Sequence, residues 1–249
     1  MRWRLAEALL VRYGEFVFRY RNVLFPAVIA TLVLSFPPYP GSERTLDLEL
    51  LGFAIAGLGQ ALRALVVGLA YIKRGGVNKR IYADSLVTEG LFAHCRNPLY
   101  AGNILMFLGL FMIYNHPAVY LLGGLFVLSS YAAVVAAEER YLEGRFGPAF
   151  REYCVSVPRW IPNLRGLRET LLGMRFNWRR VLIKEYASAA SWLLTACTLL
   201  AYESIRSPRA SATDAATLRA SIGVAIIVVA LTTLVWRLKK SGRLRATGV

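Results

Sequence analysis

The segment AHCRNPLYAGN, residues 93–103, places polar side chains directly before a long apolar run. Polar groups at the edge of hydrocarbon are costly unless they have partners. Proline disfavours the helical conformation at Asn97 and suits the first position of a helix, so we expect a helix to begin at Pro98 with Asn97 as its N-cap. The free N–H groups of that helix end, with Arg96 beside them, predict a position where a carboxylate or phosphate can bind.

Two adjacent carboxylates, Glu138 and Glu139, follow the next apolar run. The turn at residues 114–118 allows only a hairpin, and at about 1.5 Å per residue the two flanking runs rise about 25 and 30 Å. The glutamates therefore return to about the depth of Pro98. The carbonyl end of a helix and its apolar surroundings do not favour anions, so we expect both carboxylates to face a cation. Alternatively, Arg96 simply forms an interfacial salt bridge with one of them.

An anion pocket and a cation pocket on neighbouring helices fit a ligand that carries both charges. S-adenosylmethionine has a carboxylate, an ammonium group and a sulfonium. A zwitterionic lipid head group also fits this pattern.

Arg63 lies in the middle of another apolar segment, with Gln60 one turn before it. An arginine inside the membrane is a candidate functional residue, and we expect it to bind an acceptor carboxylate or to pair with a glutamate. The other interpretation is that its long side chain extends to the membrane surface. His94 is a candidate base or an interfacial hydrogen-bonding residue.

The chain of 249 residues is 56% hydrophobic, which is typical of a membrane protein. Apolar runs of membrane-spanning length occur near residues 22–36, 50–72, 98–114, 118–138, 186–203 and 220–236. The sequence therefore predicts an all-α, polytopic helical membrane protein with about six transmembrane helices.

The positive charge is distributed unevenly along the chain. The net charge is +15, and 25 of the 30 basic residues lie in the N-terminal segment, the 73–97 loop, residues 139–185 and the tail after Trp236. In an alternating six-span topology all four segments lie on one side, which the positive-inside rule makes cytoplasmic. Both termini and the candidate site are then cytoplasmic, in what we expect to be a bacterial inner membrane. The charge reflects topology and does not indicate a nucleic-acid partner.

Two further segments, residues 1–20 and 167–184, alternate arginines with apolar residues at helical spacing and are predicted to be interfacial helices. The expected organisation has three parts. Residues 1–49 hold an interfacial helix and the first membrane helix, residues 50–162 the membrane core with the candidate site, and residues 163–249 an interfacial helix and two more membrane helices.

The cysteines, Cys95, Cys154 and Cys197, are three in number and widely spaced. They match neither a zinc-binding spacing nor a disulfide framework, so we expect no metal site.

The segments LVTEGLFAHCRNPLYAGN and AAEERYLEGRFGPAFREYCVSVPRWIP resemble the isoprenylcysteine carboxyl methyltransferase family, which shares its core with the phospholipid N-methyltransferases. The matching positions are Gly90, Phe92, Arg96, Asn97, Pro98, Tyr100, Gly102, Glu138, Glu139, Phe146, Gly147, Tyr153, Val157, Arg159 and Pro162. The resemblance covers roughly residues 50–162. Asn97 stands where the family commonly has histidine, as in the lipid-methylating branch, so the acceptor stays open.

The resemblance implies methyl transfer from S-adenosylmethionine, entering from the cytosol, to a lipophilic acceptor that enters sideways from the bilayer. The acceptor atom is then a prenyl-type carboxylate or a lipid amine or hydroxyl. The cofactor-binding residues would be His94, Arg96, Asn97, Pro98, Tyr100, Gly102, Glu138 and Glu139. The catalytic residues would be Arg63, Tyr100, Glu139 and Arg159, with Arg159 and Tyr153 on a cytosolic lid.

Two other functions are compatible with the sequence. The membrane sterol and enone reductases share a similar helix arrangement and a related motif, and their cofactor would be NADPH. A small membrane scaffold or transporter would need only interfacial salt bridges, although the chain lacks an obvious internal repeat or a row of polar midplane residues.

Overall fold

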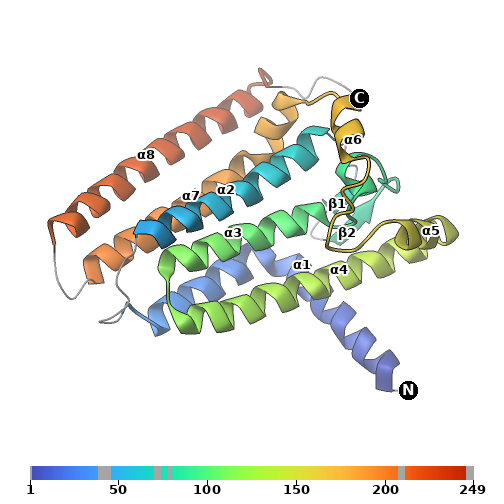
Figure 1. The fold of residues 1–249 in the computed structure, drawn as a ribbon, viewed down its shortest axis with the longest axis horizontal. Helices are drawn as coiled ribbons and strands as arrows, with labels where there is room; N and C mark the ends of the chain where they lie inside the picture. The colour runs from blue at the N-terminus through green and yellow to red at the C-terminus, as the bar shows by residue number, and fades with distance from the viewer. Residues whose placement is uncertain (1, 39–45, 70–73, 78–79, 207–210, 245–249) are drawn as a thin grey trace.

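The apolar runs form helices, because hydrocarbon offers backbone N–H and C=O groups no partner other than the chain itself. The computed structural model describes residues 2–38, 46–69, 74–77, 80–206 and 211–244. Within these ranges six long helices lie side by side (Figure 1): α1 (Arg2–Ser35), α2 (Leu46–Leu69), α3 (Pro98–Tyr114), α4 (Gly124–Phe146), α7 (Trp178–Arg206) and α8 (Ala212–Lys240).

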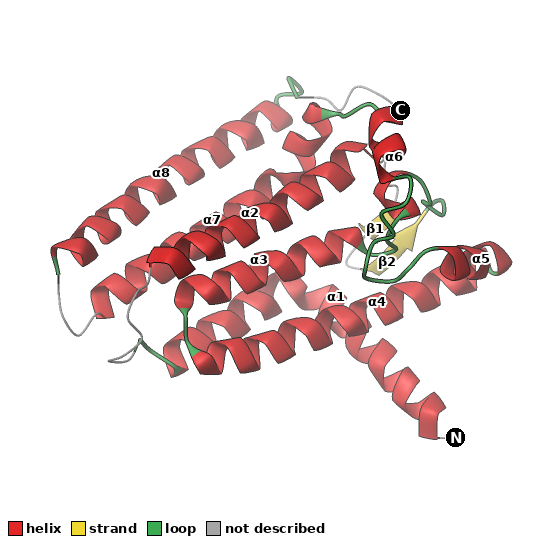
Figure 2. Cartoon of the chain, viewed as in Figure 1, coloured by secondary structure: helices red, strands yellow, loops and turns green. Residues whose placement is uncertain are grey.

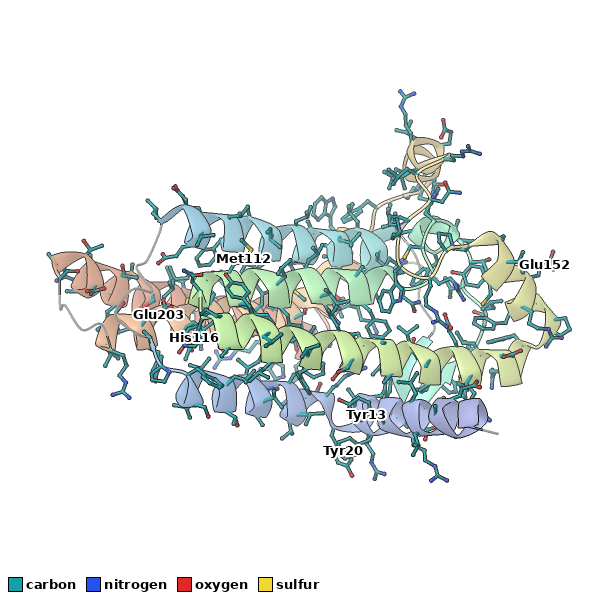
Figure 3. All side chains as sticks on the ribbon, turned by 60° about the horizontal axis from the view of Figure 1, so that its bottom comes forward. Tyr13, Tyr20, Met112, His116, Glu152 and Glu203 are labelled. Atoms are coloured by element: carbon teal, nitrogen blue, oxygen red, sulfur yellow. The ribbon has the colours of Figure 1, made fainter. Side chains whose placement is uncertain are left out.

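The short π-helix η2 (Val119–Gly123) directly precedes α4, and the other short elements gather at one end of the bundle. This end carries the 3-10 helix η1 (Gly90–Ala93), α5 (Pro148–Ser156), α6 (Leu167–Gly173) and an antiparallel hairpin of β1 (Arg74–Val77) and β2 (Arg80–Ala83). Apart from this hairpin the regular elements of the described residues are helices, joined by loops and turns (Figure 2). Helix α1 begins and α8 ends at the same end of the bundle, and Figure 3 places Glu152 of α5 there, with His116 and Glu203 at the opposite end.

Among the residues that the structure describes, four helical segments are long and apolar enough to cross a membrane: Ala6–Ser35, Leu46–Leu69, Val119–Phe146 and Ala212–Lys240. Helix α3 is apolar but has only 17 residues, and α7 is longer but more polar. The chain is therefore a polytopic helical membrane protein, and four of the six predicted spans meet this criterion of length and composition.

The helices form two groups. Helix α1 packs on α4, whereas α2 packs on α3 and α7, and α8 packs on α7. Glycines bring α2 and α3 together, since a Cβ atom on Gly59 would lie 2.5 Å from the carbonyl oxygen of Gly102. Tyr13 joins α1 to α4, with its hydroxyl 3.2 Å from that of Ser130.

The structure differs from the expectations at four places. Helix α4 continues to Phe146, so Glu138 and Glu139 lie inside it and not at its carbonyl end. The predicted interfacial helix at residues 1–20 and the first membrane helix form one continuous helix, α1, which contains Pro26. The predicted helix at residues 167–184 is divided, because α6 ends at Gly173 and α7 begins at Trp178. The β1–β2 hairpin was not predicted, because its four-residue strands contain too little alternating pattern to indicate a sheet.

Candidate functional site

The start of α3 is held by backbone contacts with residues 157–170, which we call the covering segment. Helix α3 begins at Pro98 with Asn97 at the N-cap position, as predicted. The Arg96 N–H donates to the Pro158 carbonyl at 2.9 Å. The Asn97 side chain makes no capping hydrogen bond, and its Nδ2 instead donates to the Arg159 carbonyl at 3.2 Å. The predicted capping interaction is therefore wrong: the side chain donates through Nδ2 to the covering segment, and its Oδ1 accepts no N–H of the first turn of α3.

His94 and Cys95 extend this attachment. The His94 Nδ1–H donates to the Asn163 carbonyl at 2.6 Å, and Nε2 accepts from the Thr170 hydroxyl at 2.9 Å. The buried Cys95 thiol lies 3.3 Å from the Trp160 carbonyl, and burial raises its pKa. Both ring nitrogens of His94 are thus engaged by the covering segment.

Glu139 lies between two arginines. Its carboxylate is 3.0 Å from Nη1 of Arg96 and also accepts from both Nε and Nη2 of Arg159. Arg96 Nη1 is in addition 2.9 Å from the Cys154 Sγ. The three charged groups connect α3, α4 and the covering segment at the end of the bundle that carries α5.

Glu138 has a different environment. It is buried, and its carboxylate accepts a hydrogen bond from the Tyr100 hydroxyl at 2.6 Å. Together with Arg96, Asn97 and Glu139, it lines a space of only about 10 Å³. The charged residues that the sequence indicates are therefore adjacent, and ion pairs fill most of the space between them.

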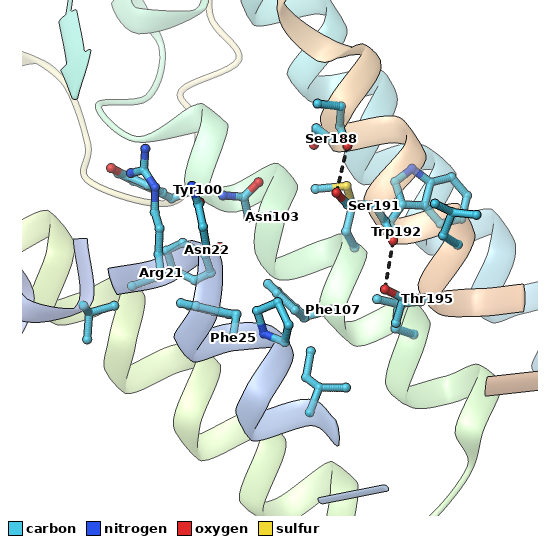
Figure 4. A pocket seen from close by; sticks show the side chains of 18 of the residues that line it. Arg21, Asn22, Phe25, Tyr100, Asn103, Phe107, Ser188, Ser191, Trp192 and Thr195 are labelled. Carbon is cyan, nitrogen blue, oxygen red and sulfur yellow. Dashed lines mark hydrogen bonds between the residues drawn. The ribbon is translucent and has the colours of Figure 1, made fainter. Parts of the chain in front are cut away.

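A much larger cavity begins on the other side of Tyr100 and Glu138. Its volume is about 970 Å³, and residues of α1, α3, α4 and α7 line it, together with Arg63 of α2. Figure 4 shows residues from two facing helices: Arg21, Asn22 and Phe25 of α1 and Ser188, Ser191, Trp192 and Thr195 of α7. Asn97, Tyr100, Asn103 and Glu138 lie on its wall, so the cavity reaches the polar motif.

The α7 wall of this cavity is less polar than its sequence indicates. The hydroxyls of Ser191, Thr195 and Thr198 each donate to a carbonyl four residues earlier in the same helix. With these donors satisfied inside the helix, the wall suits hydrocarbon. The opposite wall comes from α1, and within the described ranges α1 and α7 face each other across the cavity without extensive packing.

Arg63 pairs with a glutamate, one of the two expected roles. Its Nε and Nη2 each donate to a carboxylate oxygen of Glu185 at 2.8 Å, and Nη1 donates to Oδ1 of Asn103 at 2.6 Å. Gln60 Nε2 also donates to Glu185, at 3.2 Å. Arg63 is thus held inside the bundle and does not extend to the membrane surface.

The structure divides the predicted site residues into three sets. Arg63, Asn97, Tyr100 and Glu138 line the large cavity, whereas Arg96 and Glu139 lie just outside it with Arg159. His94, Pro98 and Gly102 line neither space: Gly102 packs against Arg63 and Gly59, and His94 binds the covering segment.

Four residues of the cavity region escaped the sequence analysis: Arg21, Asn103, Tyr131 and Glu185. Arg21 and Glu185 stand at the edges of apolar runs, where charged residues usually anchor a helix at the membrane surface. Lys184 precedes Glu185 directly in sequence, so nothing in the sequence indicated that this carboxylate pairs with Arg63. In the described part of the chain no group of three or more His, Cys, Asp or Glu residues is arranged to hold a metal ion.

The fold and the cavity define a membrane protein with a polar site at one end of a helical bundle. Residues 50–149 match the phospholipid methyltransferase family. The cobalt-zinc-cadmium resistance protein CzcN of Cupriavidus metallidurans is 32% identical over 164 residues, which are 65% of this chain and 69% of that protein. The protein-S-isoprenylcysteine O-methyltransferase of Schizosaccharomyces pombe is 33% identical over 160 residues, 64% of this chain and 63% of the relative.

No solved structure gives a match. On the strength of these matches, the chain belongs to the phospholipid methyltransferase family.

Proposed function

We propose that the protein transfers a methyl group from S-adenosylmethionine to a lipophilic acceptor inside the membrane. The observation that carries this proposal is the cavity of about 970 Å³, which runs from helices α1 and α7 to the motif residues Asn97, Tyr100 and Glu138. A non-enzymatic membrane scaffold that needs only interfacial salt bridges would not require a cavity of this size. The volume lies at the upper end of the range for small-molecule sites, about 300–1,000 Å³, so it has room for an acceptor chain as well as a cofactor.

The residues at the polar end fit the cofactor by their charges. Glu138 places a buried carboxylate on the cavity wall, which suits the cofactor's cationic part. Arg96, next to the N-terminus of α3, would hold a carboxylate, and Glu139 orients Arg96 through their ion pair just outside the cavity. When bound, S-adenosylmethionine supplies an electrophilic methyl group on a positively charged sulfur.

The chain's own residues contribute chiefly by alignment, because methyl transfer requires the reacting atoms in line at about 3–3.5 Å. The Tyr100 hydroxyl fixes the Glu138 carboxylate in place, and the covering segment closes the cytosolic side. A carboxylate acceptor needs no general base. An amine acceptor must lose a proton, for which Tyr100, on the cavity wall and bound to Glu138, is the candidate.

The acceptor enters between α1 and α7, which face each other across the cavity and would open it to the bilayer. In this topology the six long helices all cross the membrane, with both termini, α5 and α6 in the cytoplasm. The positions of the start of α1 and the end of α8 at one end of the bundle, with ten basic residues in the segment 139–185, support this orientation. The host membrane is a bacterial inner membrane, as the sequence analysis expects.

The expected division into residues 1–49, 50–162 and 163–249 then acquires a functional meaning. The core at residues 50–162 carries the cofactor residues, and the flanking parts supply the two acceptor-facing walls, from α1 and α7.

Calorimetric titration of the detergent-solubilised full-length protein with S-adenosylhomocysteine tests the proposal. We expect binding in the micromolar range, weakened about tenfold or more in Glu138→Gln, because a charge-assisted contact is lost. Glu143→Gln is the matched control, since Glu143 lies on the same helix in an exposed pair with Arg151.

Binding of NADPH without S-adenosylhomocysteine would contradict the proposal and favour the reductase function. The absence of binding for both ligands would leave a non-enzymatic membrane protein.

A further inference from the structure

A series of hydrogen bonds crosses the bundle from α7 to the wall of the cavity. It begins at Glu185, which is 5% exposed and binds Arg63 through both carboxylate oxygens. The remaining nitrogen of the guanidinium donates to Oδ1 of Asn103. The arginine charge is neutralised in this way, so Arg63 positions Asn103 and is not the residue that attracts an anion into the cavity.

Asn103 lines the cavity, and so does Tyr131 of α4. Oδ1 of Asn103 accepts from Arg63, so this side chain has only its amide N–H₂ left to donate. The Tyr131 hydroxyl is a further donor that can bind an occupant of the cavity.

Tyr131 lies next to the proposed reaction centre. Its ring is 5.3 Å, centroid to centroid, from that of Tyr100, which binds Glu138. Phe25 and Phe107 surround the ring on other sides, at 5.4 and 6.4 Å. A donor at this position is shielded from water, so it interacts strongly with an oxygen of the occupant.

Arg21 supplies a positive charge at the same end of the cavity. It lines the cavity from α1, and its guanidinium carbon lies 4.3 Å from the centroid of the Phe18 ring. Among the residues that the structure describes, no carboxylate lies within 4 Å of Arg21, in contrast to Arg63. Arg21 and Tyr131 are therefore two hydrogen-bond donors, one of them cationic, that line the cavity near Tyr100 (Figure 4).

We propose that Arg21 and Tyr131 form the subsite for the acceptor's head, and that this head carries an anionic oxygen, as in a lipophilic carboxylate or a lipid phosphate. The proposal rests on the proposed function, because it names the acceptor class of the same cavity. Glu185 and Arg63 act as positioning residues for Asn103, which lines the same cavity. The hydrocarbon part of the acceptor lies along α7, where Trp192 is on the cavity wall.

Quenching of Trp192 fluorescence by brominated chains tests this subsite in the full-length protein. The probes are 9,10-dibromostearic acid, 9,10-dibromostearyl phosphate and the uncharged methyl ester of the acid. A Trp192→Phe variant identifies the part of the signal that comes from the cavity. We expect at least one anionic probe to quench at a concentration about tenfold lower than the ester, because charge-assisted hydrogen bonds are lost in the ester.

In Arg21→Gln and Tyr131→Phe this preference falls to about threefold or less, whereas quenching by the ester is unchanged. The matched control is Arg19→Gln, which removes the same charge from an exposed position of α1 that does not line the cavity. A preference for the carboxylate alone assigns the subsite to lipophilic acids, and a preference for the phosphate alone assigns it to lipid phosphates.

Equal quenching by acid, phosphate and ester in the wild type would overturn the subsite, as would an undiminished preference in Arg21→Gln. Titration of the same variants with S-adenosylhomocysteine separates this failure from that of the proposed function. The subsite predicts unchanged cofactor affinity in Arg21→Gln. Loss of cofactor binding in the wild type would contradict the methyltransferase and leave the anion preference as an independent result.

Discussion

Two adjacent glutamates have different partners, and this difference shapes the site. Glu138 faces the cavity and is fixed by the Tyr100 hydroxyl. Glu139 faces the other way, into the two guanidinium groups of Arg96 and Arg159. Arg159 is 48% exposed, so its pair with Glu139 is screened by solvent and contributes little to stability. We infer that this pair fastens the covering segment, and that Glu138 acts on the ligand.

The reactivity of Cys154 reports on the packing of this end of the molecule. Burial raises the pKa of the Cys154 thiol, although the Arg96 guanidinium beside it acts in the opposite direction. The thiolate is the reactive form, so alkylation by iodoacetamide at pH 7–8 is expected to be slower than for free cysteine.

The rate should rise about tenfold per pH unit and continue to rise above pH 8.5, where the rate for free cysteine levels off. Mass spectrometry of the labelled peptide measures it, with Cys154→Ser as the blank. A rate that is already constant at pH 7 would contradict the packing described.

At the scale of elements, close contact between α2 and α3 fixes the position of Arg63 relative to the α3 wall of the cavity. A Cβ atom on Gly59 would lie 2.5 Å from the Gly102 carbonyl oxygen, so Gly59→Ala must push the helices apart. We expect a loss of about 1–3 kcal/mol in the free energy of unfolding. Thermal unfolding in one detergent measures the effect.

The control for this change lies two residues away on the same helix. A Cβ atom on Gly57 would meet nothing within 4 Å, so Gly57→Ala should be neutral or slightly stabilising. Equal destabilisation by both alanines would mean that the α2–α3 contact is not the cause.

The attachment of α7 to α2 depends on one buried ion pair. Glu185→Leu leaves the Arg63 charge without its carboxylate, and the side chain of Arg63 is only 16% exposed, so we expect a cost of about 3–5 kcal/mol. The double variant Arg63→Met, Glu185→Leu should recover most of this loss, since no buried charge remains unpaired. If the double variant is as unstable as the single one, the packing of these two side chains, and not their charges, holds α7 against α2.

At the scale of the whole molecule, the sequence predicts the site better than the walls around it. Local rules were sufficient for the start of α3 at Pro98 and for the return of Glu138 to its depth, because both follow from helix geometry. The partner of Arg63 was not predictable, since Glu185 is 122 residues away and only packing brings it close. The position of the α7 hydroxyls on the cavity wall was not predictable either, because it depends on how α7 packs with the other helices.

The C-terminal helices also have a role that the family match does not cover. Residues 50–149 match the family, yet α7 lies beyond them and provides one wall of the cavity and the partner of Arg63. Helix α8 supports α7 and presents apolar side chains such as Ile226 and Leu231 on its exposed surface. The site and its acceptor path therefore depend on the part of the chain that begins at Trp178.

Transfer of tritium from methyl-labelled S-adenosylmethionine into a bacterial lipid extract tests the central claim most directly. With the protein in lipid nanodiscs, we predict label in the organic phase, reduced about 10- to 100-fold by Glu138→Gln and unchanged by Glu143→Gln. Label that stays at the level of empty nanodiscs, or that is the same for Glu138→Gln and the wild type, would contradict a methyltransferase site at this cavity.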